Sequence, residues 1–387
     1  MIGGLRRQTA SIRSTEGMPA VTTLENTATV PGHDPAAVTT PLGLVDHDGR
    51  PVAGSTLTMP SHETLLELHA AMVRGRRFDT QATALTKQGR LAVYPSSRGQ
   101  EACQVAAAAV LRERDWLFPT YRDSVAAVTR GVPAAEVLSL LRGEWHCGYD
   151  PYERRVAPQC TPLATNTLHA VGVAHAARVR GLDEVALVLL GDGATSEGDT
   201  HEALNMAAVW RAPVVFLVQN NGYAISVPLA KQTAAPSLAS KGVGYGMRAV
   251  LVDGNDAAAV HAVLSEAVAH AAAGHGPTLV EAITYRIEAH TNADDATRYR
   301  DRSEVEHWLA RDPVARLETL LRSWRLLDDA AVAAVRDEAE QLAASVRDAM
   351  NADVAADPDE LFAHVYANVP PHLQRQRDML RAELAAS

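Results

Sequence analysis

The stretch LVLLGDGATSEGD, residues 187–199, decides the fold of this chain. An apolar run, Val185–Leu190, ends abruptly in an aspartate between two glycines, Gly191-Asp192-Gly193. An unbroken apolar run of this length is typical of a strand that is buried on both faces of a parallel sheet. Glu197–Trp210 is then predicted to form a helix, and Val214–Val218 a second buried strand. The stretch therefore opens a predicted strand–helix–strand unit.

The same alternation continues on both sides of this unit. Downstream, strands are predicted at Ala249–Val252 and Thr278–Ile287, with a helix at Ala257–Ala273 between them and further helices after Ser303. Upstream, the spacing of apolar residues predicts helices, and these cover residues 61–89, 99–112, 133–142 and 165–180. This order predicts an α/β fold with a mostly parallel sheet, helices on both of its faces and a helical C-terminal region.

The N-terminal region differs in composition. Residues 1–57 are rich in Thr, Ala, Pro and Gly and show no periodic pattern, so we expect a flexible extension before a folded domain over 58–387. Early arginines faintly suggest a mitochondrial transit peptide, but Glu16 and Glu25 interrupt the pattern. A plain extension is the favoured interpretation.

Composition narrows the possible partners and location. The net charge of −10 over 387 residues disfavours nucleic acid as a general partner. No apolar stretch approaches the roughly 20 residues that span a bilayer, so no membrane segment is expected. Cys103, Cys147 and Cys160 are too few for a disulfide framework and are typical of free thiols in a reducing compartment. We therefore expect a cytoplasmic protein.

The aspartate between two glycines is predicted to lie where ligands bind. In parallel sheets this place is the carboxyl end of a strand, and the next helix points its free N–H groups at the same space. A dinucleotide fingerprint is disfavoured because its third glycine, Gly198, comes two places late. A P-loop is disfavoured because Asp199 stands where that motif needs a lysine.

A third phosphate-binding pattern uses a divalent cation as a bridge. Mg²⁺ prefers about six oxygen ligands and usually takes one or two carboxylates together with phosphate oxygens. Asp192 offers a carboxylate, and the second strand ends in NNGYAIS, where Asn221 offers an amide oxygen and Tyr223 a backbone carbonyl. A GDG followed by NN at the next strand end is the spacing of thiamine-diphosphate-binding proteins.

Several further motifs extend this likeness along the chain. They are GQEACQVA (99–106), FPTYRD (118–123), TPLAT (161–165), GYGM with VDGND (244–256) and YRIEAHTNADDATRYR (285–300). With them, the chain resembles the alpha subunit of the decarboxylating, first component of 2-oxo-acid dehydrogenase complexes, most closely the branched-chain type. The resemblance covers about residues 58–387, and it implies a thiamine-diphosphate-binding catalytic domain there.

The resemblance implies roles for individual residues. Asp192, Asn221 and the Tyr223 carbonyl would hold Mg²⁺, and His290 would lie at the diphosphate and the reaction centre as the catalytic residue. The other residues implied to contact thiamine diphosphate are Tyr121, Arg122, Thr161, Leu163, Gly191, Gly193 and Ala194. A structural K⁺ is implied at residues 160–166, although Cys160 and Asn166 replace the Ser and Gln of the relatives, which weighs against it. Gln219 stands where such relatives often carry an arginine.

The resemblance also implies partners and a reaction. A 2-oxo acid would be oxidatively decarboxylated, and its acyl group would pass to the lipoyl group of an acyltransferase component. A separate beta subunit would complete the active site in an α₂β₂ assembly. Pyruvate or acetoin remains an alternative substrate, and a non-catalytic subunit that binds Mg²⁺ and phosphate is an alternative from a different class.

Overall fold

A five-stranded parallel sheet forms the centre of the computed structural model, which describes residues 38–144, 147–352 and 357–386. The strands lie in the order β1-β2-β3-β7-β6. Their bounds are Trp116–Phe118 (β1), Ala186–Gly191 (β2), Val214–Asn220 (β3), Thr278–Ile283 (β7) and Arg248–Asp253 (β6). All four predicted strands are present, and the predicted parallel α/β fold is confirmed. The sequence did not indicate β1, because its three residues are too few to show a pattern.

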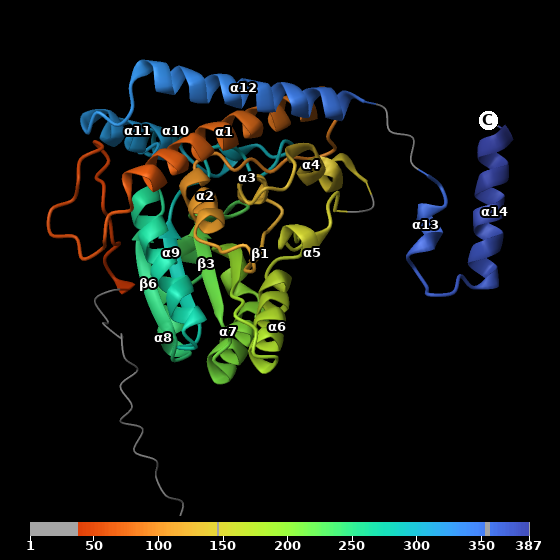
Figure 1. Cartoon of the computed structure of the whole chain (residues 1–387), viewed down its shortest axis with the longest axis horizontal. Helices are drawn as coiled ribbons and strands as arrows, with labels where there is room; N and C mark the ends of the chain where they lie inside the picture. The colour runs from red at the N-terminus through yellow and green to blue at the C-terminus, as the bar shows by residue number, and fades with distance from the viewer. Residues whose placement is uncertain (1–37, 145–146, 353–356, 387) are drawn as a thin grey trace, which may run out of the picture.

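Helices cover both faces of the sheet, as predicted (Figure 1). Successive strand residues alternate between the two cores: Leu187 and Leu189 face one, and Val188 and Leu190 the other. The first core also contains residues of α1 (His62–Lys87), α2 (Glu101–Ala109), α3 (Ser124–Thr129), α4 (Ala134–Arg142) and α9 (Ala257–Ala272). The second core contains residues of α6 (Thr165–Val179) and α7 (Gly198–Trp210). Helix α8 (Ala239–Gly244) packs against β6 on this same face of the sheet.

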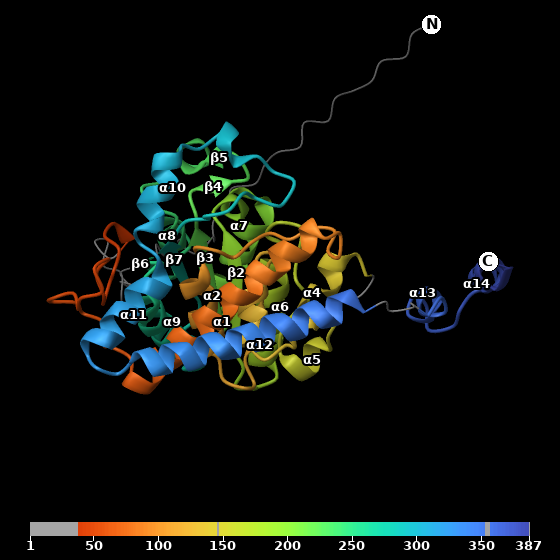
Figure 2. The ribbon, with the colours of Figure 1, turned by 90° about the horizontal axis from the view of Figure 1, so that it is seen from above.

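The C-terminal region is helical, as predicted. Its helices are α10 (Arg302–Leu309), α11 (Pro313–Ser323), α12 (Asp329–Asn351), α13 (Glu360–Ala363) and α14 (Pro371–Ala386). Helix α12 lies along α1 on the outside of the molecule, and α13 and α14 stand apart from the main body (Figure 1). Figure 2 shows α10 beside the short hairpin of β4 (Tyr223–Ala224) and β5 (Val227–Pro228). The other short helices are α5 (Pro151–Arg154), η2 (Gly193–Ser196), η3 (Leu229–Lys231) and η4 (Ala296–Arg298).

Residues 38–57 differ from the flexible extension expected through residue 57. The backbone of Leu42 pairs with β6, donating to the carbonyl of Leu251 and accepting from the N–H of Asp253, both at 2.9 Å. The side chains of Leu44 and Val45 are buried. The expectation therefore does not hold for this segment, because its apolar residues add to the core at the edge of the sheet. Residues 1–37 of the predicted extension lie outside the described part of the chain.

Candidate functional site

The two glycines that flank Asp192 are present for different physical reasons. A Cβ atom on Gly193 would lie 2.7 Å from the Cβ of Ala224, so glycine lets the turn after β2 pass the turn after β3. A Cβ on Gly191 would meet nothing within 4 Å, because Gly191 borders a cavity. Asp192 itself is only 1% exposed and precedes the short helix η2. The motif thus places a buried carboxylate between two closely packed strand ends.

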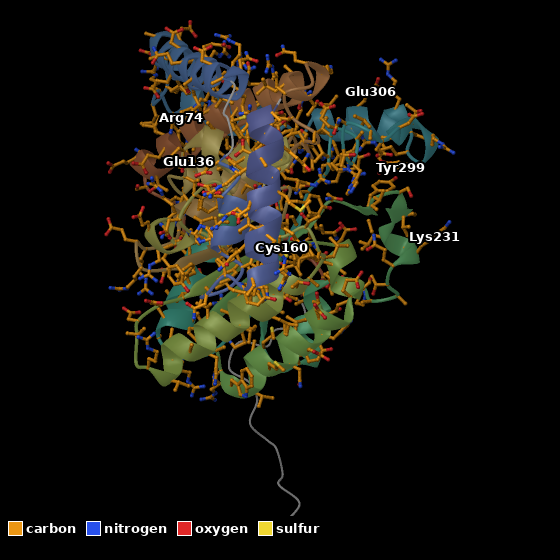
Figure 3. The ribbon with its side chains drawn as sticks, turned by 90° about the vertical axis from the view of Figure 1, so that its right-hand side faces the viewer. Arg74, Glu136, Cys160, Lys231, Tyr299 and Glu306 are labelled. Carbon is orange, nitrogen blue, oxygen red and sulfur yellow. The ribbon has the colours of Figure 1, made fainter. Side chains whose placement is uncertain are left out.

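The cavity has a volume of about 400 Å³ and lies at the carboxyl ends of β2 and β3. Most of the residues singled out in the sequence line it together: Tyr121, Arg122, Leu163, Gly191, Asp192, Gly193, Ala194, Asn221, Tyr223 and His290. Thr161 is not among the lining residues and is exposed. Figure 3 shows Lys231, which also lines the cavity, and Tyr299 at the same edge of the molecule.

The predicted Mg²⁺ ligands lie on adjacent strand ends. Gly191 at the end of β2 pairs in register with Gln219 of β3, so the following residues of the two strands meet at one edge. The Oδ1 atom of Asn221 accepts from the backbone N–H of Tyr223 at 3.2 Å, and its Nδ2 donates to Gln100 Oε1 at 3.0 Å. Within the described residues, no group of three or more His, Cys, Asp or Glu side chains could hold a metal ion. A cation here would therefore need amide, carbonyl and phosphate oxygens as well as Asp192.

Among the described residues, none forms an ion pair with Asp192, although the charge of Arg286 acts on it, so its carboxylate is open to a cation. Burial raises the pKa of its carboxyl group, and the hydrogen bond from Gln232 acts in the opposite direction. Gln232 Nε2 donates to Asp192 Oδ2 at 2.7 Å, while Gln232 Oε1 is buried without a hydrogen-bond partner. A buried carboxylate whose hydrogen-bond donor is a neutral amide offers the kind of oxygen ligand that Mg²⁺ prefers. The donor set thus fits the metal that the sequence predicted.

Two arginines form the cationic wall of the cavity around His290. Arg122 Nη2 lies 3.0 Å and Arg286 Nη1 2.9 Å from His290 Nδ1. Burial and the two guanidinium groups lower the pKa of His290 to about 4. Because a guanidinium can only donate, Nδ1 accepts and the neutral ring carries its proton on Nε2. Two forked donors of fixed charge beside a cavity suit a ligand with anionic oxygens, such as a diphosphate.

Arg286 is a site residue that the sequence analysis did not single out. Its side chain is 1% exposed, lines the cavity and donates from Nη2 to the carbonyl of Ile225 at 2.8 Å. Burial, followed by the repulsion from Arg122, lowers its pKa to about 10. The available signal was its place in YRIEAH, where a charged residue comes three positions after a buried strand. Gln100 and Gln232 were missed as contacts of Asn221 and Asp192 because glutamines give no recognisable spacing.

The charged loop after β7 is held by its own contacts. Asp294 Oδ2 accepts from the backbone N–H of His290 at 2.8 Å and from the hydroxyl of Tyr299 at 2.5 Å. Arg300 donates to the carbonyl of Ile287 at 2.6 Å. These bonds fold the loop back on the strand end, so that His290 faces the cavity rather than solvent.

The residues considered for K⁺ make other contacts. Asn166 Nδ2 donates to the carbonyl of Leu189 at 2.8 Å, and Cys160 Sγ to that of Pro162 at 3.2 Å. The K⁺ site stays a prediction. Gln219, at the arginine position of the relatives, donates to Asp123 Oδ1 at 2.7 Å and accepts from Gln100 at 3.0 Å. Gln219 is therefore linked through Gln100 to the side-chain amide of Asn221 by a chain of hydrogen bonds.

The fold and the cavity define an α/β protein with a site for a metal-bridged phosphate ligand at the ends of parallel strands. Residues 69–359 match the family described as "Dehydrogenase E1 component", and the chain belongs to that family. Membership implies thiamine diphosphate as the cofactor, and the resemblance drawn from the motifs is confirmed.

Two relatives show where the chain stands within this family. It is 49% identical to the 3-methyl-2-oxobutanoate dehydrogenase subunit alpha of Mycobacterium tuberculosis, over 89% of this chain and 94% of the relative. It is 36% identical to the pyruvate dehydrogenase E1 component subunit alpha of Staphylococcus aureus, over 87% of this chain and 92% of the relative. The chain is thus more similar to the first, a dehydrogenase for a branched 2-oxo acid, than to the second.

Proposed function

We propose that this chain is the alpha subunit of a thiamine-diphosphate-dependent branched-chain 2-oxo-acid dehydrogenase. One observation carries the proposal: Asp192, Asn221 and His290, from three separate strand ends, line one cavity together with Arg122 and Arg286. The 49% identity to an enzyme named for 3-methyl-2-oxobutanoate supports the substrate class. The reaction is the oxidative decarboxylation of a 2-oxo acid, with acyl transfer to the lipoyl group of an acyltransferase component.

Each wall of the cavity has its own part in holding the cofactor. Asp192, Asn221 and the Tyr223 carbonyl would hold Mg²⁺, and Arg122 and Arg286 would place positive charge beside the diphosphate oxygens. When bound, the cofactor would supply the electron sink for the decarboxylation. His290, kept neutral by its two arginine neighbours, offers an Nε2 proton without adding charge to the site.

A beta subunit is proposed to complete the site. Among the described residues, the carboxylates that line the cavity are Asp192 and Glu197. Asp192 is assigned to the metal, and Glu197 is exposed at the start of α7. The acid that activates the cofactor is therefore expected from the partner, in an α₂β₂ assembly. We also propose a cytoplasmic location; within the described part of the chain, none of the helices is long and apolar enough to span a membrane.

A rate measurement with an artificial electron acceptor tests this function. The chain is purified with a candidate beta subunit, Mg²⁺ and thiamine diphosphate are added, and 3-methyl-2-oxobutanoate and 4-methyl-2-oxopentanoate are compared with pyruvate. Faster turnover of the branched acids is expected. A preference for pyruvate would move the chain to the pyruvate type, which the Staphylococcus aureus relative represents. Failure to bind the cofactor with the partner present would favour a non-catalytic subunit. Turnover by the alpha chain alone would contradict the shared active site.

A further inference from the structure

A buried carboxylate lies behind the cavity without lining it. Glu281 is in the middle of β7, opposite Val218 of β3 and Leu251 of β6, and its side chain is 2% exposed. Its Oε1 accepts from Asn220 Nδ2 and its Oε2 from the backbone N–H of Ala239, both at 2.7 Å. Both oxygens face donors, so a carboxyl group satisfies this position as no apolar side chain could. The two bonds lead in different directions.

The first bond reaches the turn after β3. Asn220 is the last residue of β3, and its Oδ1 accepts from the backbone N–H of Gly222 at 3.1 Å. Glu281 takes the amide hydrogen of Asn220 and so fixes which way its carboxamide points. The carboxamide in turn holds the backbone at Gly222, whose φ of +84° favours glycine. Asn221, the proposed amide ligand of Mg²⁺, lies inside this turn.

The second bond reaches the turn after β2. Ala239 is the first residue of α8, and the same helix carries Lys241. Lys241 Nζ donates to the carbonyl oxygen of Thr195 at 2.7 Å and lies 3.0 Å from its hydroxyl oxygen. Thr195 belongs to η2, and both its backbone N–H and its hydroxyl donate to the carbonyl of Asp192. This path therefore ends on the residue that offers the carboxylate to the metal.

We propose that Glu281 is a positioning residue that fixes the turn of Asp192 and the turn of Asn221 relative to each other. A single cation between two turns requires their oxygens at a set separation, and small errors of placement weaken binding. One rigid carboxylate on the strand behind both turns provides that constraint. The inference rests on the proposed function, because it assumes that the two turns share a Mg²⁺ and its diphosphate.

Metal binding to a Glu281→Gln variant tests the inference. The full chain is purified with its beta subunit, and Mn²⁺ affinity is measured by electron paramagnetic resonance in the presence of thiamine diphosphate. Gln has nearly the shape of Glu, but its NH₂ group would face one of the two donors, so one turn loses its anchor. Mn²⁺ affinity is expected to fall about tenfold, the lower end for residues that support a metal ligand. Excess Mg²⁺ is expected to restore kcat, which a misfolded site would not allow.

Asp256→Asn is the matched control. Asp256 is also buried after a strand and also accepts backbone N–H groups, from Leu44, Val45 and Ala259. It does not line the cavity. Asp256→Asn is expected to lower the melting temperature and to leave Mn²⁺ affinity within about twofold, inside the normal spread for a remote change.

The outcomes separate the inference from the proposed function. If the wild-type complex binds neither Mn²⁺ nor thiamine diphosphate, the proposed function fails. If it binds both and Glu281→Gln binds Mn²⁺ equally well, the inference is overturned; equal losses in Glu281→Gln and Asp256→Asn would also overturn it. If Glu281→Gln does not fold, Lys241→Met removes the contact with Thr195 and the positive charge near Glu281, while both hydrogen bonds of the Glu281 carboxylate remain. Wild-type Mn²⁺ affinity in Lys241→Met would then overturn the inference, and a weaker affinity at an unchanged melting temperature would support it.

Discussion

Two strands of the sheet end in the same dipeptide, Asp-Gly, and the two aspartates have different partners. After β2, Asp192 is buried and its carboxylate accepts from the neutral amide of Gln232. At the end of β6, Asp253 pairs with Arg316 at 2.8 Å, and the nearby Asp256 lies 3.7 Å from the same guanidinium. Arg316 forms ion pairs with the carboxylates beside β6, whereas within the described residues Asp192 has no ion-pair partner and Arg286 acts on it from beyond ion-pair distance. A strand-end aspartate thus indicates a ligand site where the fold leaves its carboxylate without an ion pair.

The largest expected effect comes from removing the under-neutralised carboxylate. Asp192→Asn is expected to weaken Mn²⁺ binding by more than about 100-fold, beyond what loss of a merely supporting residue produces. The melting temperature of the metal-free complex is expected to stay or rise, because a buried charge without a cation is removed. Electron paramagnetic resonance and thermal melts measure both. Asp253→Asn is the control, with unchanged Mn²⁺ affinity and a lower melting temperature. Equal effects of the two variants would contradict the proposed difference between Asp192 and Asp253.

A smaller effect on cofactor binding is expected from substituting one of the two arginines that line the same cavity as Asp192. Arg286→Met is expected to weaken thiamine diphosphate binding about 10- to 100-fold, since a hydrogen bond to a charged group contributes about 1.5–3 kcal/mol. It is also expected to raise the pKa of His290 from about 4, because one nearby positive charge no longer disfavours the imidazolium. The acid limb of kcat/KM then moves to higher pH. Calorimetry and a pH profile measure these changes, and exposed Arg298→Met serves as the control.

A substitution of Gln232 tests directly whether the carboxylate of Asp192 binds a cation. Its amide donates to the carboxylate that the metal needs, so Gln232→Ala is expected to strengthen Mn²⁺ binding by about fivefold, equivalent to a net hydrogen bond of about 1 kcal/mol. Mn²⁺ titration of the complex measures the change. A weaker affinity would instead show that the orphaned Oε1 of Gln232 supports the ion. Ala234→Ser, at an exposed position of the same loop that does not line the cavity, controls for effects of the loop itself.

The smallest expected effect concerns the pH dependence of stability at helix α11, on the side of the molecule that carries Arg316. Helix α11 carries Arg316 and also Glu318, which lies 3.6 Å from the buried His69. Burial lowers the pKa of His69, with Glu318 acting in the opposite direction. A base with a lowered folded pKa stabilises the fold above its unfolded pKa, and this contribution is lost as the pH falls through about 6.5 toward the folded value. His69→Leu is therefore expected to lose less melting temperature than wild type between pH 7.5 and about 5.5. An equal loss would show that other groups dominate.

Local sequence predicted some parts of this protein well. The buried strands Ala186–Gly191 and Val214–Asn220 read as unbroken apolar runs because they are covered on both faces. The helix His62–Lys87 was predicted from the spacing of its apolar residues, and Ser61 caps it by accepting from the N–H of Thr64. Residues 38–57 could not be predicted in this way, because they pack through scattered apolar side chains and backbone pairing with a strand about 200 residues away.

Short-range patterns in the sequence were enough to predict the alternation of strands and helices. Together with the geometry of parallel sheets, they also placed Asp192 and Asn221 at successive strand ends. Only the tertiary structure decided the partners of those residues. Gln232 reaches Asp192, Arg286 flanks His290, and Glu281 joins two turns across strands. These contacts depend on the order β2-β3-β7, in which sequence-distant strands become neighbours. Whether a buried carboxylate meets an arginine or an amide is settled by that packing, and with it the place where a cation can bind.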